Sequence, residues 1–343
     1  MYSESDLDDA VAAGVLSRET AAALRNHVAR SHSAPAVDEE HFRLLSGFND
    51  IFVSIAVGLV LAALAWIGGS ITTPLAGALV AIAAWGLAEY FTRQRRMALP
   101  SILLLIAFVA GVTATLVGIL VELNPDFSDR TDAVLAAGIG LVAAGAAWVH
   151  WKRFMVPITV AAGAAALVAV AVAVTLAVIP AAKDAIYPIL LISGVAVFAL
   201  AMWWDMSDRE RRTRRSDVAF WLHLAAAPLI AHPVFHMLGV FNEYITLGVA
   251  AIVLVLYLVF AFVALAVDRR ALLVSSLAYV LYAMYSVFHT AGAVELAWAF
   301  TGLVIGSALL TLSAFWHPMR RLVVGTLGDL SERLPPVGTM AHA

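Results

Sequence analysis

Ten long, uninterrupted apolar runs dominate the hydrophobic pattern of the chain from residue 51 onward. Each run approaches the roughly 20 residues that an α-helix needs to cross the hydrocarbon core of a bilayer. Apolar residues are continuous within the runs and do not alternate with polar ones, so a β-barrel is not expected. The pattern predicts an all-α, polytopic membrane bundle of about ten transmembrane helices, at residues 51–69, 74–91, 100–121, 132–149, 155–179, 186–204, 218–240, 244–267, 271–289 and 294–316.

The polar ends of the chain predict two further regions beside this bundle. Residues 1–37 are predicted to form a cytosolic helical hairpin and linker, because Gly14 can end one helix and Ser17 can cap the next. Residues 38–316 form the transmembrane bundle, including an amphipathic lead-in to the first span. Residues 317–343 combine an apolar stripe with charged neighbours, which predicts a cytosolic surface helix and a tail.

The hairpin carries a family resemblance. The phrase Ala13-Gly14-Val15-Leu16-Ser17 between two short helices resembles the SHOCT-like hairpin at the ends of many bacterial membrane proteins. This resemblance implies an oligomerising or regulatory attachment and not a catalytic one. The whole chain resembles uncharacterised bacterial multi-pass membrane proteins with a soluble helical N-terminus, which implies an inner-membrane location and carries no activity with it.

Composition supports lipid as the main solvent and excludes several kinds of chemistry. The chain is 62% hydrophobic and 13% charged, whereas soluble domains carry about a quarter charged residues. It contains no cysteine, so disulfides, thiolate metal sites and cysteine nucleophiles are excluded. It also lacks a Walker loop, a dinucleotide fingerprint, HExxH and GxSxG, so ATP-driven transport by this chain alone is not expected.

The basic residues predict the orientation of the spans. Of the 21 lysines and arginines, all except Arg130 and Lys183 lie at the ends of the chain or in alternate connections. Positively charged connections stay in the cytoplasm, so both termini are predicted to be cytoplasmic. The densest charge run, 205–217, is predicted to anchor this topology, with contact to anionic lipid headgroups or a soluble partner as the alternative. Because the run is short and membrane-bound, it does not indicate nucleic-acid binding. The segments predicted to face the cytoplasm are 1–50, 92–99, 150–154, 205–217, 268–270 and 317–343.

The seventh run is the part of the chain with candidate chemistry. It is the only long apolar run with several ionisable side chains, namely His223, His232 and His236. His232 and His236 are four residues apart, which places them about 40° apart on one helix face, while His223 falls on the opposite face. By the predicted topology, His289 lies at a similar depth in the outer leaflet, and Glu295 lies at the same edge.

Two interpretations of these histidines remain open. Histidine nitrogen and carboxylate oxygen suit zinc, copper, iron or manganese, so His232, His236 and His289, with Glu295, are candidate ligands of an outer-facing metal or haem. The identity of any cofactor is left open. Alternatively, each histidine hydrogen-bonds a backbone carbonyl that a proline in the same run leaves without its N–H partner.

Three function classes are compatible with this pattern. A permease or channel for a small solute or ion ranks first, because it is the commonest role of a bundle of this size, and it predicts a polar cavity at the seventh helix. A membrane-embedded metal or haem protein predicts converging histidines. A structural or assembly subunit predicts a closed, dry bundle with lipid, further copies or a larger complex as partners. Gly302 and Gly306 have GxxxG spacing, for which packing within the chain is favoured over a dimer interface.

Overall fold

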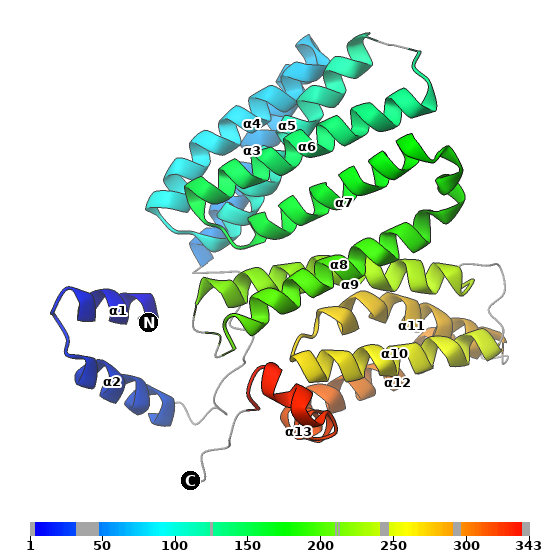
Figure 1. Cartoon of the computed structure of the whole chain (residues 1–343). Coiled ribbons are helices and arrows are strands. Elements are labelled where there is room, and N and C mark those ends of the chain that lie inside the picture. Colours follow the sequence, from blue (N-terminus) through cyan, green and yellow to red (C-terminus); the bar gives the residue numbers. More distant parts are fainter. Residues whose placement is uncertain are drawn as a thin grey trace. The chain divides into compact units, whose positions relative to one another are not determined.

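A computed structural model of the chain describes residues 4–31, 48–123, 126–209, 211, 213–240, 247–290 and 296–337. The regular structure of these residues is helical, and they contain no strand (Figure 1). The chain divides into two compact units, residues 1–41 and 42–343. The predicted all-α class is therefore confirmed.

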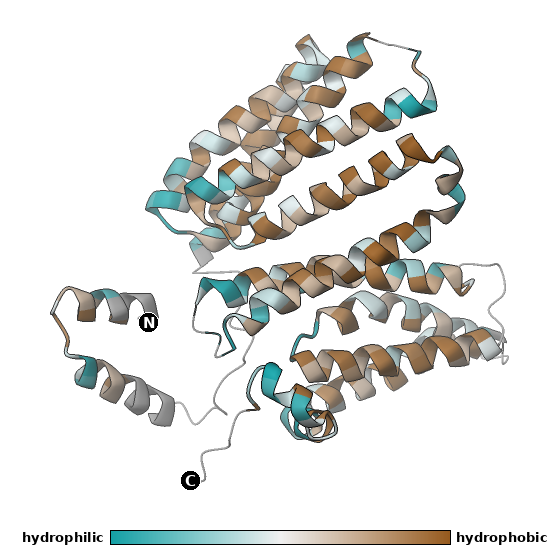
Figure 2. Cartoon of the chain, in the orientation of Figure 1, coloured by the Kyte–Doolittle hydropathy of each residue, from teal (hydrophilic) through white to brown (hydrophobic). Residues whose placement is uncertain are grey.

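All ten predicted spans are present as helices. Among the described residues, ten helices are long and apolar enough to cross a membrane, and each overlaps one predicted run. Figure 2 shows apolar residues along these helices and polar residues gathered near their ends. The helices are α3 Phe48–Ile71, α4 Thr73–Ala88 (continued by a π-helix, η1, Glu89–Gln94), α5 Ala98–Leu123, α6 Asp129–Phe154, α7 Ile158–Val178, α8 Ile186–Met206 (preceded by a 3₁₀ turn, η2, Pro180–Ala185), α9 Arg214–Met237, α10 Leu247–Val267, α11 Ala271–Thr290 and α12 Ala297–Ala314.

The short connections on one side of the bundle share a backbone feature. We call this the basic side; it comprises the helix ends joined by connections 95–97, 155–157, 207–213 and 268–270, at the left ends of the helices in Figure 1. Each connection contains one non-glycine residue in the left-handed conformation, with φ between 52° and 57°. Such a residue stops a helix and reverses the chain within a few positions. These four residues are Arg96, Met155, Arg211 and Asp268.

Helices α3 to α7 pack through small residues. Helices α4 and α5 approach so closely that a Cβ atom added to Gly77 would lie 2.4 Å from the backbone nitrogen of Thr115. One added to Gly111 would lie 2.7 Å from the nitrogen of Ala81. Small residues allow this close approach in lipid.

The glycine pair in α12 behaves differently from those in α4 and α5. Nothing in the described part of the chain lies within 4 Å of a Cβ atom added to Gly302 or Gly306. The expected packing within the chain is therefore wrong for this pair. Helix α12 packs on α11 and α13, and both glycines lie away from these contacts.

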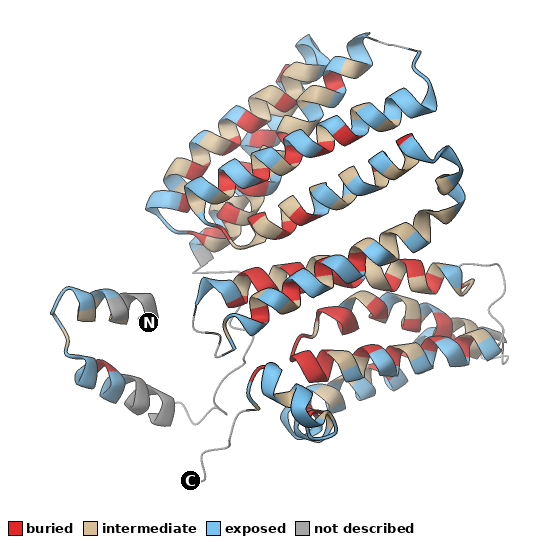
Figure 3. Cartoon of the chain, viewed as in Figure 1, coloured by how far each residue is buried: buried red, intermediate tan, exposed pale blue. Residues whose placement is uncertain are grey.

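Helix α9 is the most buried span. Half of its most apolar window is buried within the protein, against 17–39% for the other nine candidate spans (Figure 3). One face of α9 packs against α10 and α11, and another packs against α7 and α8. Its side chains with no exposed surface are Val218, Ala219, Leu222, Ala226, Ala227, Ala231 and Phe235.

The terminal helices follow the predicted local signals. Helices α1 (Glu4–Ala12) and α2 (Arg18–Ser31) are joined at Gly14, whose φ of 73° is left-handed, and the Ser17 hydroxyl accepts a hydrogen bond from the Thr20 N–H at 3.0 Å. The predicted lead-in to the first span lies almost entirely outside the described residues. After α12, helix α13 (Trp316–Gly325) packs on α10 and α12, and a 3₁₀ turn, η3 (Gly328–Arg333), follows it.

Candidate functional site

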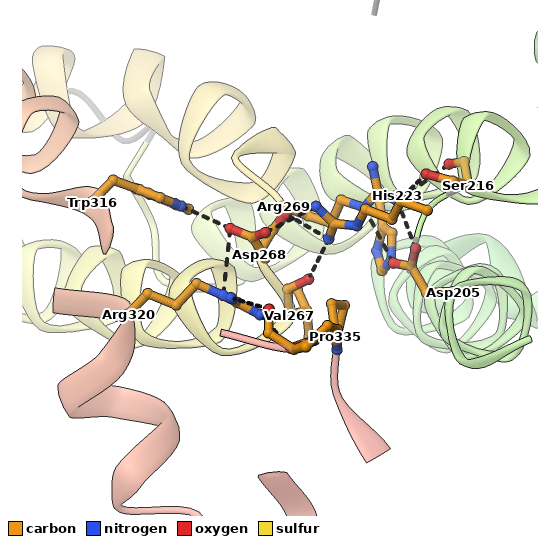
Figure 4. Close-up of polar contacts among 11 residues, drawn as sticks. Asp205, Ser216, His223, Val267, Asp268, Arg269, Trp316, Arg320 and Pro335 are labelled. Carbon is orange, nitrogen blue, oxygen red and sulfur yellow. Dashed lines mark hydrogen bonds and ion pairs between the residues drawn. The ribbon is translucent and has the colours of Figure 1, made fainter. Parts of the chain in front are cut away.

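A buried charge network lies on the basic side, where α8, α9 and the α10–α11 connection meet (Figure 4). The last turn of α8 supplies Asp205, and its carboxylate contacts the side chains of His223 and Arg269. The His223 Nε2 lies 2.9 Å from Asp205 Oδ2, and Arg269 donates from Nη2 to Oδ1 at 2.5 Å and from Nε to Oδ2 at 3.2 Å. All three side chains are at most 3% exposed. Arg269 also donates to the backbone carbonyl of Ser216 at 3.2 Å.

A second carboxylate, Asp268, extends the network toward α13. Its left-handed backbone, which aspartate tolerates better than most residues, belongs to the sharp turn between α10 and α11. Oδ1 of Asp268 accepts from the indole Nε1 of Trp316 at 2.8 Å, and Oδ2 accepts from Nη1 of Arg211 at 2.9 Å. Arg320 of α13 pairs with the same carboxylate at 3.5 Å.

The arginines of the network also bind backbone carbonyls of the C-terminal segment. Arg320 donates from Nη2 to the carbonyl of Pro335 at 2.7 Å and from Nη1 to that of Pro336 at 3.1 Å. Arg209, in the α8–α9 connection, donates to the carbonyl of Leu334 at 3.2 Å. The chain therefore folds back over the basic side after α13, and its carbonyl oxygens satisfy guanidinium groups.

The charge balance indicates what this arrangement can do. Two carboxylates (Asp205 and Asp268) face three guanidinium groups (Arg211, Arg269 and Arg320), all nearly buried. Removing one partner from a buried ion pair leaves an uncompensated charge and typically costs about 3–5 kcal/mol. Each of the four carboxylate oxygens of Asp205 and Asp268 already accepts a hydrogen bond from a side chain of the network. The arrangement therefore suits holding helices together better than it suits reaction with a substrate.

The sequence does not reveal that charged side chains of two connections are buried. Segments 205–217 and 268–270 are predicted to face the cytoplasm, with the first anchoring the topology, and both statements stay predictions. Within these segments Asp205, Arg211 and Arg269 are buried inside the protein. This burial arises because α13 and the C-terminal segment cover the ends of α8 and α10.

The predicted histidine pair is brought together on one face of α9. The ring centres of His232 and His236 lie 6.2 Å apart. Nδ1 of His232 lies 2.8 Å from the hydroxyl of Tyr279 in α11, and His236 stacks on Tyr187 of α8 with 3.6 Å between ring centres. As predicted, His223 does not share their site, because it faces Asp205.

The other proposed ligands do not complete a metal site in the described structure. His289 lies near the end of α11 with its ring 5.7 Å from that of Tyr285, and Glu295 lies outside the described residues. Over the described ranges, no three histidine or carboxylate side chains are placed to hold a metal ion. The metal or haem hypothesis stays a prediction. The alternative hypothesis is that each histidine hydrogen-bonds a backbone carbonyl. Two histidines instead contact side chains, His232 the hydroxyl of Tyr279 and His223 the carboxylate of Asp205.

The space beside α9 is apolar. A groove of about 510 Å³ separates α9 from α10 near their ends opposite the basic side. Among the described residues, its lining contains no ionisable side chain, so the described part of the groove is hydrocarbon surface. The lining residues are Val234, Met237, Leu238, Ala251, Ile252, Val255 and Leu256.

A second polar contact on the basic side joins η1, the continuation of α4, to α6. Arg153 donates from Nε and Nη2 to the two carboxylate oxygens of Glu89, at 2.7 and 2.9 Å. These side chains are 41% and 31% exposed. One turn earlier in α6, His150 is fully buried, and its Nδ1 lies 3.3 Å from the Thr159 hydroxyl of α7. The ion pair is thus open to solvent, although its geometry matches that of Asp205 and Arg269.

No protein-family model, no curated protein and no solved structure matches the chain. The length and hydropathy of the ten candidate spans identify a multi-pass membrane protein on their own. Lipid is therefore the environment of most of its surface. Any more specific function has to follow from the packing around α9 and from the charge network.

Proposed function

We propose that the chain is a structural or assembly subunit in a membrane, closed and dry at its centre. The observation that carries this proposal is the packing of α9. Between the charge network and the histidine pair, the buried face of α9 consists of Ala226, Ala227 and Ala231, none of which has exposed surface. A solute pathway needs polar groups or a water-filled space through the hydrocarbon region. Neither is present in this part of α9.

The permease or channel is a second candidate, and one observation favours it. His232, His236, Tyr187 and Tyr279 form a polar aromatic cluster in the half of α9 away from the basic side. Two prolines in α9 lack the N–H groups that a regular helix would use, so the helix can bend there. On this interpretation the described structure is a closed conformation, sealed by the alanine segment and the charge network.

Cysteine accessibility separates these two candidates cleanly, because the natural chain contains no cysteine. Single variants Ala226→Cys, Ala227→Cys and Ala231→Cys would be treated with a membrane-impermeant thiol reagent in sealed vesicles of both orientations. We expect no labelling of any of them, while the positive control Ser207→Cys, in an exposed connection, reacts from one side only. Rapid labelling of Ala226→Cys or Ala227→Cys would overturn the dry centre and favour the permease.

The same vesicles test the proposed location and orientation. We infer a bacterial inner membrane with both termini in the cytoplasm, supported by the positive charge of the connections on the basic side. Ser207→Cys should then react only with reagent that reaches the cytoplasmic face. Reaction from the opposite face would reverse the orientation and leave the span count intact.

The assembly role requires a partner or further copies of the chain. We propose that the hairpin of α1 and α2 contributes to this assembly, as its resemblance to SHOCT-like hairpins implies. Light scattering of the protein extracted from its own membrane at native expression should give a protein mass above the 36.4 kDa of one chain. A mass equal to one chain would contradict the assembly role.

Metal analysis of the same material tests the hypothesis that the histidines bind a metal or haem. A protein without bound metal would contradict that hypothesis.

A further inference from the structure

The C-terminal segment crosses the basic side as a separate layer over the charge network. Its Leu334 side chain is buried in a small apolar cluster with Ala266 and Val267 of α10, against which Phe198 and Met202 of α8 pack. The neighbouring Pro335 is buried as well, whereas Leu330, four residues before Leu334, is 60% exposed. The segment is therefore attached over a very short stretch.

The polar attachments of this segment use backbone atoms only. The successive carbonyls of Leu334, Pro335 and Pro336 accept from Arg209 and Arg320. Residues 335 and 336 are prolines without an N–H, so the segment cannot continue the preceding helix, and its carbonyls stay available to the arginines. No carboxylate of the segment takes part in the described network, so its departure would leave both ion pairs of Asp205 and Asp268 with their partners.

One short apolar contact and a few hydrogen bonds to backbone carbonyls hold the segment, so it can detach without breaking the ion pairs beneath it. A region with few buried apolar contacts opens at lower free energy than the core to which it is attached. We propose that Gly328–Val337 is a releasable strap that closes the basic side of α8 and α10, and that its release admits water to the buried network. This conformational device does not depend on which of the two candidate functions is correct.

The consequence of release is specific to one region. The carbonyls of the strap bind Arg320, which pairs with Asp268, and Arg209, which follows the end of α8. Ser216 belongs to the same network through its carbonyl, which accepts from Arg269, and it is 7% exposed. On this proposal, water that enters after release of the strap reaches Ser216. Ala84 of α4 has no exposed surface and packs with α3 and α5, in a core that contains no residue of the strap. A cysteine at 216 therefore reports strap release, and a cysteine at 84 reports general unfolding.

The test combines these two probes with two substitutions in the strap. Leu334→Asp places a charge in the apolar contact, and Leu330→Asp places the same charge at the exposed position of the same segment. We expect Leu334→Asp to raise the rate of maleimide labelling of Ser216→Cys by about tenfold or more, and Leu330→Asp to leave it unchanged. Neither substitution should change the labelling of Ala84→Cys.

A milder variant guards against simple misfolding. Arg209→Gln removes a guanidinium that binds the carbonyl of Leu334 and leaves the apolar contact intact, so it should give a smaller rise in Ser216→Cys labelling than Leu334→Asp. An unchanged rate at Ser216→Cys in Leu334→Asp would overturn the strap. Equal rises at Ser216→Cys and Ala84→Cys would also overturn it, because the segment would then be part of the general core.

Discussion

Two ion pairs on the basic side have the same chemistry and opposite surroundings. Glu89 with Arg153 and Asp205 with Arg269 are both bidentate pairs of a carboxylate and a guanidinium. The first pair joins η1 to α6, and the second joins α8 to the α10–α11 connection. The first pair is 31% and 41% exposed, and the second is 1% and 3% exposed. Exposed pairs contribute little to stability, whereas a buried pair cannot lose one partner without a large penalty. Burial, and not contact geometry, therefore decides what each pair does.

In the described part of the bundle, a further layer of chain covers only the second pair. Helix α13 and the strap lie over the ends of α8 and α10, and Trp316 and Arg320 enter the network from this layer. Among the described residues of the bundle, Glu89 and Arg153 stay 31% and 41% exposed. Helices α3 to α5 are held together instead by close backbone contacts at glycines such as Gly77 and Gly111. The two parts of the bundle thus reach cohesion by different means.

Removing the central carboxylate should give the largest effect. Asp205→Ala leaves Arg269 and His223 buried without their shared acceptor, and we expect a loss of about 3–5 kcal/mol of stability. Thermal unfolding of the detergent-solubilised protein, followed by loss of the monodisperse peak, measures this loss. The matched variant Glu89→Ala should unfold close to the natural protein. Equal shifts for the two variants would contradict the comparison.

Adding a methyl group at the α4–α5 contact tests whether close backbone packing stabilises helices α3 to α5. Gly77→Ala places a Cβ atom against the backbone of α5, and overpacking of this kind costs about 1–3 kcal/mol. Gly86→Ala is the control, because a Cβ atom there meets nothing within 4 Å. We expect Gly77→Ala to lower the unfolding temperature and Gly86→Ala to leave it unchanged or raise it. A stable Gly77→Ala would show that the α4–α5 contact is looser than described.

The smallest effect should come from the exposed pair and should depend on salt. Glu89→Gln removes the charge and keeps the shape, so any destabilisation reflects the Coulomb attraction to Arg153. Salt screens exposed charges, so the difference from the natural protein should vanish at molar salt. For Asp205→Asn the difference should persist at the same salt concentration, because a buried pair is screened much less. A salt-independent effect of Glu89→Gln would mean that this pair is more buried than its exposure indicates.

The sequence was sufficient for the spans because lipid imposes a strong constraint on each of them separately. A run of about 20 apolar residues has few alternatives to a membrane helix, and all ten predicted runs correspond to helices. The spacing of His232 and His236 likewise placed them on one face, since helix periodicity is a local property. Such local rules carried the prediction of the fold and part of the candidate site.

Long-range pairings could not be predicted in the same way. Asp205 and Arg269 are 64 residues apart, and each looks like an ordinary charge at the end of a span until the fold brings them together. The layer over the ends of α8 and α10 comes from residues after 315, whose stripe of leucines predicted a helix lying on the membrane surface. For Gly302 and Gly306 the sequence predicted a helix contact that the described structure lacks. GxxxG spacing shows that a helix could approach closely, but not whether one is there.

A double-mutant cycle on each ion pair tests the central claim most directly. The cycle measures how far the loss in a double variant differs from the sum of the two single losses. For Asp205→Asn with Arg269→Gln we expect the double variant to lose much less than that sum, because neither charge is then left buried alone. For Glu89→Gln with Arg153→Gln the losses should be small and additive. Equal coupling in the two cycles would contradict the claim that burial separates these otherwise similar pairs.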